Sequence, residues 1–119
     1  MVYADTNFFI ALIDPNDALH QTAKKIYNTS KKQIETSLLA IAEIFSGCEQ
    51  HGMDPEVIAE NIFEIARISG ISREQAITAA HYMKNYKLRP VDALHCALAG
   101  REIISADKDM DRIGIKRIW

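Results

Sequence analysis

Four acidic residues stand at positions where a carboxylate could take part in chemistry: Asp5, Glu43, Asp92 and Asp107. If a fold brought them together, two carboxylates about 4 Å apart would repel by about 4 kcal/mol at an effective dielectric of about 20. Four of them would oppose a total folding free energy of only about 5–15 kcal/mol. Such a cluster must either take up protons or hold cations. Oxygen ligands select hard cations such as Mg²⁺ or Mn²⁺, and carboxylate-bound Mg²⁺ is most often used to bind phosphates and activate water for attack at phosphorus.

Each acid also has an ordinary structural interpretation, which the sequence leaves open. Asp5 or Thr6 could simply cap the helix that follows the first strand. Asp92 is the third residue of a predicted helix, where negative charge is favoured by up to about 1 kcal/mol, and Asp107 could be a turn or cap residue. Glu43 has small or apolar neighbours three and four residues away, which indicates a buried or closely approached face unless it marks the edge of an amphipathic stripe.

Strands that alternate with helices would place these acids at one edge of a sheet. Strands are predicted at residues 2–4, 33–37, 102–105 and 115–119, with a further short one near 68–71. Helices are predicted at residues 6–13, 18–29, 38–50, 54–67, 73–86 and 91–99, with Asp17, Ser37, Asp54 and Ser72 as caps. The alternation favours a mainly parallel sheet with helices on both faces, a three-layer α/β/α sandwich. Ligands bind at the carboxyl edge of such a sheet, where Asp5, Asp107 and the start of the helix with Glu43 would meet.

Two apolar stripes and one boundary complete the expected layout. In the helix at 18–29 the stripe consists of Leu19, Ala23, Ile26 and Tyr27, and in the helix at 54–67 it consists of Val57, Ile58, Ile62, Ile65 and Ala66. The second strand is short, and Lys31 and Lys32 bound it. The whole chain, residues 1–119, is expected to form one domain.

Composition narrows the class of protein. The 119 residues are 48% hydrophobic and 25% charged, with a formal net charge of −2, which argues against disorder. A net charge of −2 does not indicate a nucleic-acid binder. However, acids gathered around metal ions can offset basic residues elsewhere in the net charge. Cys48 and Cys96 lie in apolar helical patterns and are expected as buried free thiols, which suits a reducing cytoplasm. Because no stretch approaches about 18 apolar residues, we expect neither a secreted nor a membrane protein.

Other uses of acidic residues fit the sequence less well. The alternating acids of residues 107–111 mimic the start of a calcium-binding loop, but Arg112 stands at its turn-glycine position and Ile118 at its bidentate-glutamate position. A phosphatase that forms an aspartyl-phosphate needs a second acid two residues after Asp5, where Asn7 stands. A phospho-accepting receiver needs an acceptor Asp directly after a central apolar strand and a lysine after the last strand, and neither is evident. No glycine-rich phosphate loop occurs.

Four segments occur in a characteristic order and spacing: Asp5-Thr6-Asn7, Ala42-Glu43-Ile44, Pro90-Val91-Asp92-Ala93-Leu94-His95 and Ser105-Ala106-Asp107-Lys108-Asp109. Together they resemble the PIN-domain ribonucleases, and among these the VapC-type toxins of toxin–antitoxin pairs, over nearly the whole chain. The resemblance implies an acidic quartet that holds Mg²⁺ or Mn²⁺, made of Asp5, Glu43, Asp92 and Asp107. Thr6 and Ser105 match its accessory hydroxyls and would orient the ligands, since a carboxylate left free to rotate binds metal poorly. Asn7, Asp109 and Asp111 are further accessory candidates.

The resemblance further implies a metal-dependent endoribonuclease that cleaves single-stranded or loop RNA by means of metal-activated water. Such toxins are commonly homodimers and are held inactive by a cognate antitoxin, so RNA, the antitoxin and a second copy are the expected partners. The alternative, from another class, is a catalytically idle PIN-like domain that binds RNA or a partner protein. The helices at 54–67 and 73–86 are expected to offer the dimer face or the antitoxin groove.

Basic residues near the acids could hold the RNA backbone. Arg89 precedes Asp92 by about one turn, while Lys108 and Arg112 lie in the last acidic segment; ordinary solvated side chains are the alternative for each. His95 lies one helical turn after Asp92 and is a candidate general base. A histidine on the helix face with its hydrogen bonds satisfied is the preferred interpretation, because a metal ion would already generate the nucleophile.

Overall fold

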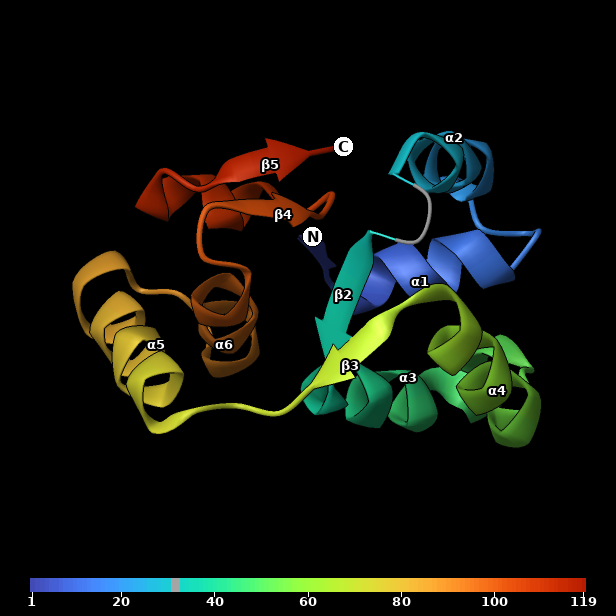
Figure 1. Ribbon diagram of the computed structural model, residues 1–119, viewed down its shortest axis with the longest axis horizontal. Helices are drawn as coiled ribbons and strands as arrows, with labels where there is room; N and C mark the ends of the chain where they lie inside the picture. The colour runs from blue at the N-terminus through green and yellow to red at the C-terminus, as the bar shows by residue number, and fades with distance from the viewer. Residues whose placement is uncertain (31–32) are drawn as a thin grey trace.

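Five parallel strands form the central sheet of the computed structural model, which describes residues 1–30 and 33–119 (Figure 1). The strands are β1 (Val2–Ala4), β2 (Ile34–Ser37), β3 (Arg67–Ser69), β4 (Glu102–Ile104) and β5 (Lys116–Ile118). Their order across the sheet is β3-β2-β1-β4-β5, and each neighbouring pair runs parallel. β1 therefore lies in the middle, with its carboxyl end between those of β2 and β4.

Helices cover both faces of this sheet (Figure 1). They are α1 (Thr6–Ile13), α2 (His20–Ser30), α3 (Leu38–His51), α4 (Pro55–Ile65), α5 (Arg73–Tyr86), α6 (Pro90–Ala99) and the 3₁₀ helix η1 (Lys108–Ile113). The first four helices pack on one face, whereas α5, α6 and η1 pack on the other. The predicted α/β/α sandwich with a mainly parallel sheet is confirmed.

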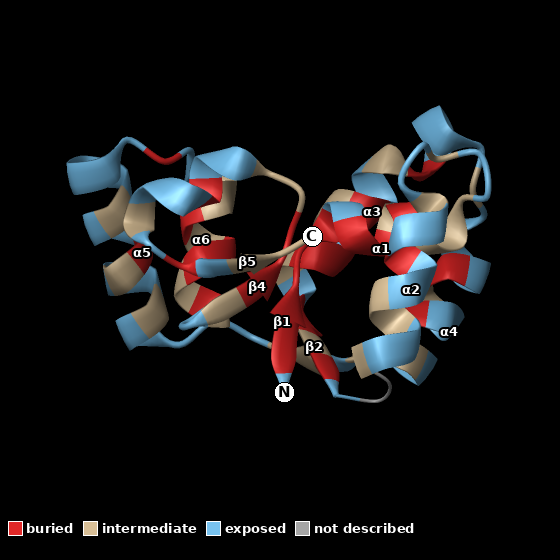
Figure 2. Cartoon of the chain, turned by 90° about the horizontal axis from the view of Figure 1, so that it is seen from above, coloured by how far each residue is buried: buried red, intermediate tan, exposed pale blue. Residues whose placement is uncertain are grey.

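β1 separates two hydrophobic cores, because successive side chains of a strand point to opposite faces. Val2 and Ala4 belong to the core shared with α1, α3 and α4, whereas Tyr3 belongs to the core shared with α5 and α6. All three residues of β1 are buried (Figure 2), as expected for a parallel strand covered on both faces. The strand thus delivers the residues that follow it to a point between the two helical layers.

Local signals decide where several helices begin and end. Ser72 and Gln75 form a reciprocal capping box at the start of α5, and the Asp54 side chain accepts a hydrogen bond at the start of α4. Gly52, with a φ of +63°, ends α3 in the left-handed conformation that favours glycine. These predicted signals are confirmed, and both cysteines are buried free thiols as expected.

Two predicted caps are wrong, those of Ser37 and Asp17, and one weak strand is shifted. Ser37 directly precedes α3, but its side chain makes no capping hydrogen bond, because its hydroxyl lies 2.9 Å from that of Tyr3 instead. The third strand, which the sequence placed only near residues 68–71, lies at Arg67–Ser69 and pairs with β2. Lys31 and Lys32, which bound the second strand in the sequence, lie outside the described residues.

Two residues expected on buried stripes are exposed. Leu19 is 40% exposed and precedes α2, which begins at His20 and not at Ala18. The Asp17 side chain accepts a hydrogen bond from the Leu19 N–H in the turn before this helix and does not cap it. Val57 is 51% exposed on α4, where its neighbour Ile58 takes the inward position. Among the helices that the structure describes, none combines the length and the hydropathy needed to span a membrane.

Candidate functional site

Asp5 lies at the carboxyl end of the central strand, on the edge of the sheet where β4 also ends. Ala4 pairs with Ile104, and the backbone N–H of Asp5 donates to the Ile104 carbonyl at 3.1 Å. The Asp5 side chain is 4% exposed and accepts a hydrogen bond from the Phe8 N–H at 3.2 Å, which caps α1. Asp5 is therefore a helix cap and an acid at the edge of the sheet at the same time.

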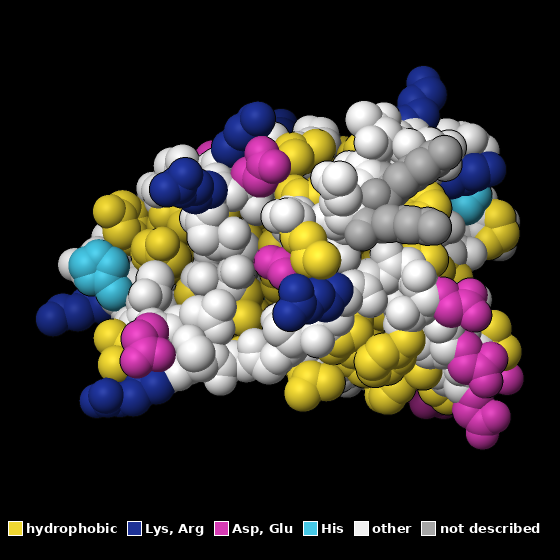
Figure 3. Space-filling view, in the orientation of Figure 1, with side chains coloured by type: hydrophobic (Ala, Val, Ile, Leu, Met, Phe, Trp, Pro, Cys, Tyr) yellow, Lys and Arg dark blue, Asp and Glu magenta, His cyan; other side chains and the backbone are white. Residues whose placement is uncertain are grey.

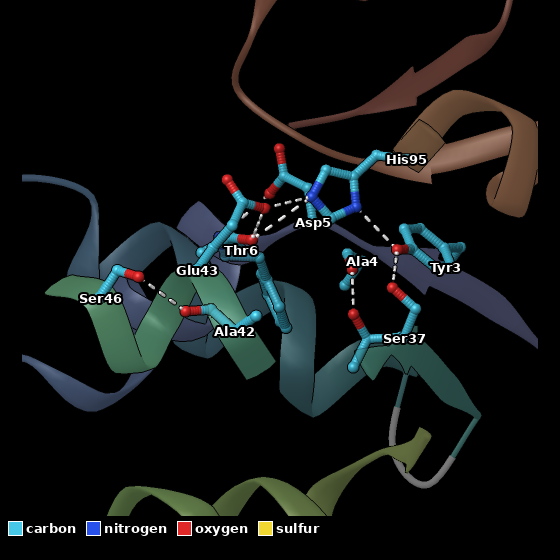
Figure 4. A network of polar contacts seen from close by, with 11 residues as sticks. Tyr3, Ala4, Asp5, Thr6, Ser37, Ala42, Glu43, Ser46 and His95 are labelled. Carbon is cyan, nitrogen blue, oxygen red and sulfur yellow. Dashed lines mark hydrogen bonds and ion pairs between the residues drawn. The ribbon is translucent and has the colours of Figure 1, made fainter. Parts of the chain in front are cut away.

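Glu43 reaches the same edge from α3, which begins where β2 ends. Its Oε1 accepts a hydrogen bond from Thr6 Oγ1 at 2.5 Å and lies 2.6 Å from His95 Nε2 (Figure 4). Burial raises the pKa of this carboxyl, but the hydrogen bonds from His95 and Thr6 outweigh burial, so the pKa is lowered. Glu43 is thus held ionised with one oxygen anchored, while its side chain remains 33% exposed.

A buried chain of hydrogen bonds lies behind Glu43. His95 of α6 is 2% exposed, and its Nδ1 lies 2.7 Å from the hydroxyl of Tyr3, which itself approaches Ser37 at the end of β2 (Figure 4). His95 is satisfied through both ring nitrogens, in agreement with the preferred interpretation, but it lies inside the site. Sequence reasoning missed Tyr3, whose signal is a polar tip within an otherwise apolar strand.

Asp92 and Asp107 approach the edge from α6 and from the end of β4. Asp92 lies in the first turn of α6 and is partly buried. Burial raises the pKa of Asp92, and the charges of Asp107 and Glu43 raise it further, while His95 opposes the rise. The Asp107 side chain accepts a hydrogen bond from the Asp109 N–H at 2.9 Å and caps η1. The two acids therefore repel each other, and each also occupies an ordinary position at a helix start.

The four acids act electrostatically on one region, although they do not form a closed metal site. Burial raises the pKa of Asp5, and the charge of Glu43 adds to the rise. The buried thiol of Cys96 also has a raised pKa, first because of burial and then because of three charges, those of Asp92, Asp107 and Asp5. Within residues 1–30 and 33–119, however, no three Asp, Glu, His or Cys side chains are placed to share one metal ion.

The donor set nevertheless fits a hard cation in its chemistry. The acids offer only oxygen ligands, which Mg²⁺ and Mn²⁺ prefer, and a positive charge would relieve their mutual repulsion. Glu43 Oε2 has no hydrogen bond or ion pair to any residue in the described part of the chain. A shared ion would require these carboxylates to draw closer together than they lie here.

The two hydroxyls that the resemblance implies as supports are both buried beside the acids. Thr6 donates to Glu43, and it is 7% exposed. The Ser105 hydroxyl accepts a hydrogen bond from the Asp107 N–H at 3.0 Å and, by hydrogen bonding, opposes the burial-driven rise in the pKa of Asp5. Each hydroxyl therefore contacts a residue of the predicted quartet.

Asp109 and Asp111 each pair with an arginine. Asp109 Oδ1 lies 3.1 Å from Arg112 Nη2, and Asp111 Oδ1 lies 2.9 Å from Arg117 Nε. The hydrogen bond from Arg117 lowers the pKa of Asp111. Arg117 also donates to the Ser105 carbonyl at 3.2 Å. This arginine therefore lies next to the site, although the sequence did not single it out. These arginines already neutralise both accessory acids.

The remaining predicted site residues lie on the surface. Asn7, Arg89 and Lys108 are exposed. Arg89 precedes α6 without a side-chain capping bond, and Lys108 begins η1. Arg112 also donates to the Lys87 carbonyl at 3.3 Å, so it is the most constrained of the three cations that we expected to contact RNA.

Comparisons with known proteins agree with this architecture. A family model described as the PIN domain matches residues 2–116. Among solved structures, VapC20 of Mycobacterium tuberculosis, described as a sarcin-ricin loop cleaving toxin, is 19% identical with a TM-score of 0.83, covering 97% of this chain and 96% of that one. A toxin–antitoxin complex from Klebsiella pneumoniae is 25% identical with a TM-score of 0.76, covering 92% and 89%. FitAcB from Neisseria gonorrhoeae is 16% identical with a TM-score of 0.78, covering 100% and 97%. The comparison with curated proteins gives no match.

Proposed function

Because the chain belongs to the PIN domain family, we propose that it is a divalent-metal-dependent endoribonuclease and the toxin of a toxin–antitoxin pair. Its fold is that of VapC-like toxins. The observation that carries the proposal is the convergence of four acids on one edge of the sheet, where burial and mutual charge raise the pKa of Asp5 and Asp92. Hydrolysis at phosphorus is the chemistry to which acids with a hard cation are suited.

In this proposal the four acids have different roles in metal binding. Asp5, Glu43 and Asp92 would hold a first Mg²⁺ or Mn²⁺, and Asp107 would help to recruit a second ion or orient the attacking water. When bound, a divalent ion supplies an activated water and neutralises charge on the phosphate oxygens. Thr6 fixes the orientation of Glu43 by its hydrogen bond, and the lowered pKa of Glu43 keeps that ligand ionised.

Exposed cations beside the acids would bind the RNA backbone. Arg89 at the start of α6 and Lys108 at the start of η1 are exposed, and phosphate contacts of this kind make binding strongly dependent on salt. Arg112 would have to exchange its pairing with Asp109 for a phosphate. Single-stranded or loop RNA in the cytoplasm is the proposed substrate, and that compartment keeps free thiols reduced, here Cys48 and Cys96.

Exposed apolar side chains support the proposal of an antitoxin and a second copy as partners. Leu38 and Phe45 on α3, with Val57 and Phe63 on α4, are 45–60% exposed, and Figure 3 shows hydrophobic side chains gathered over this part of the molecule. An exposed apolar patch of this kind commonly marks a protein interface. The helices at 54–67 and 73–86 were expected to bind partners. The first of them, α4, contributes to this patch together with α3, which was not expected to.

The direct test is cleavage of single-stranded and stem–loop RNAs by the purified chain in Mg²⁺, in Mn²⁺ and in EDTA. We expect cleavage with either ion and none in EDTA. Glu60→Gln removes an exposed carboxylate of α4 and serves as the matched control, with cleavage like that of the wild type. Undiminished cleavage in EDTA would contradict the metal-dependent mechanism, and RNA binding without cleavage under all conditions would favour the idle alternative.

A further inference from the structure

Three buried side chains form a continuous hydrogen-bonded path from the end of β2 to Glu43 (Figure 4). Ser37 Oγ lies 2.9 Å from the Tyr3 hydroxyl, which lies 2.7 Å from His95 Nδ1, and His95 Nε2 lies 2.6 Å from Glu43 Oε1. Ser37, Tyr3 and His95 are each at most 2% exposed. Polar groups buried this deeply need hydrogen-bond partners, and here the partners are one another.

The carboxylate at the end of the path sets its direction. An ionised carboxylate only accepts hydrogen bonds, so His95 Nε2 must donate to Glu43. In a neutral imidazole Nδ1 then accepts, which requires the Tyr3 O–H to donate to it and the Ser37 O–H to donate to Tyr3. Burial raises the pKa of Tyr3 well above its usual value, so this phenol keeps the proton that it donates.

Glu43 receives both of its hydrogen bonds on the same oxygen. Thr6 Oγ1 donates to Oε1 at 2.5 Å, and His95 Nε2 donates to the same atom. Oε2 is left without a hydrogen bond or ion pair to the residues that the structure describes. Because two donors from different elements hold Oε1, the carboxylate cannot rotate freely about its terminal bond.

We propose that His95, which donates from Nε2 and is held at Nδ1 by Tyr3 and Ser37, is a positioning residue that fixes Glu43 through Oε1 and presents Oε2 to a divalent cation. The inference rests on the proposed function and deepens it. It gives Tyr3, which touches no carboxylate, an effect on cation affinity. A Tyr3 that served only to fill the core would affect stability alone.

The test measures Mn²⁺ affinity by isothermal titration calorimetry on variants shown to be folded by thermal unfolding. Tyr3→Phe keeps the packed ring and removes the donor to Nδ1, so we expect affinity to fall about tenfold, at the low end of the about 10–100-fold range for outer partners of metal ligands. His95→Gln, whose amide can still donate to Glu43, should retain more affinity than His95→Leu. Tyr86→Phe, an exposed tyrosine of α5, is the matched control and should bind like the wild type.

A second readout uses the metal-free protein. Long-range ¹H–¹⁵N NMR of the imidazole should find the His95 proton on Nε2 in the wild type. In Tyr3→Phe the Nδ1 resonance should shift, because Nδ1 loses its hydrogen bond. A wild-type proton on Nδ1, or an unchanged Mn²⁺ affinity in Tyr3→Phe, overturns the inference, and RNA cleavage by the wild type would then leave the proposed function standing. A wild-type chain that neither binds Mn²⁺ nor cleaves RNA overturns both.

Discussion

The candidate site has two halves that differ in what holds the acids. Asp5 and Glu43, called the buried half, are held by buried groups, although Glu43 itself is partly exposed, whereas Asp92 and Asp107, called the exposed half, are partly exposed acids at helix starts. In the buried half, Asp5 is 4% exposed, and Glu43 is anchored by the buried His95. In the exposed half, Asp107 caps a short 3₁₀ helix, and the exposed acids Asp109 and Asp111 pair with arginines. Such surface pairs contribute little to stability and are screened by salt.

The difference between the two halves indicates which part of the site is already ordered in the absence of a ligand. β1 is covered on both faces, so the residues that follow it inherit a fixed position from the sheet. Asp107 instead lies three residues beyond β4 and caps η1, where most side chains are exposed although Met110 is buried, so its surroundings can adjust at lower cost. In the proposed mechanism the buried half would therefore set the position of the cation, and the exposed half would adapt to it.

The largest expected effect comes from Asp5→Asn in the buried half. We expect the rate of Mg²⁺-dependent RNA cleavage to fall by more than about a hundredfold, beyond the range for outer partners of metal ligands. Asparagine can still cap α1, so the metal-free fold should be as stable as the wild type or more stable. Thermal unfolding in EDTA checks the stability, and full activity in the variant would remove Asp5 from the mechanism.

The difference in metal-free stability between Asp5→Asn and the wild type should depend on pH, and this dependence tests whether the charge of Asp5 is its cause. Burial, assisted by Glu43, raises the folded-state pKa of Asp5 above the unfolded value of about 3.9. The ionised side chain therefore destabilises the metal-free fold as pH rises through the folded-state pKa, and the penalty is absent below the unfolded pKa. The stability gained in Asp5→Asn should be present at neutral pH and vanish in acid. A large loss of stability at all pH values would assign Asp5 to capping alone.

Metal binding should give the next largest effect, as a change in thermal stability of the wild type. At an ion concentration about 100 times Kd, binding stabilises the folded chain by about 2.7 kcal/mol, which corresponds to a Tm rise of about 10 °C for a chain of this length. EDTA should reverse the rise, and Asp5→Asn should abolish it. A Tm that does not change on addition of Mg²⁺ or Mn²⁺ would support the alternative of a catalytically idle PIN-like domain.

A smaller effect is expected from Asp107→Asn in the exposed half. Asparagine preserves the cap on η1, so stability should change by less than about 0.5 kcal/mol. Cleavage should fall about tenfold, as for a partner that acts indirectly on the metal. Mn²⁺ affinity should fall less than in Asp5→Asn. A loss equal to that of Asp5→Asn would erase the distinction between the two halves.

The smallest effect is expected from Asp111→Ala, which breaks the exposed pair with Arg117. Because arginine already neutralises Asp111, neither cleavage nor Mn²⁺ affinity should change within error. Asp109→Ala, which breaks the pair with Arg112, is the parallel case. A clear loss of Mn²⁺ affinity in either variant would make that acid a true accessory ligand and enlarge the exposed half.

Local patterns predicted the elements better than their exposed faces. Turn glycines and caps such as Gly52 and Ser72 depend on neighbouring residues alone, so they could be recognised in advance. Leu19 and Val57 were assigned to buried stripes because they are apolar, but periodicity does not reveal which apolar residues have a partner helix. The weak third strand is hard to see because it is short and lies at an edge of the sheet.

The sequence by itself determined that Asp5 and Asp107 follow strands, that Glu43 lies in the helix after the second strand and that Asp92 stands at a helix start, since these positions follow from local propensity and parallel topology. Only the tertiary structure decided what holds them. Tyr3 meets His95 across 92 residues and Ser37 across 34, and these contacts exist because β2 pairs beside the central strand while α6 packs on the face of the sheet to which Tyr3 points. Hydrogen bonds between layers depend on that packing, which no local pattern of residues encodes.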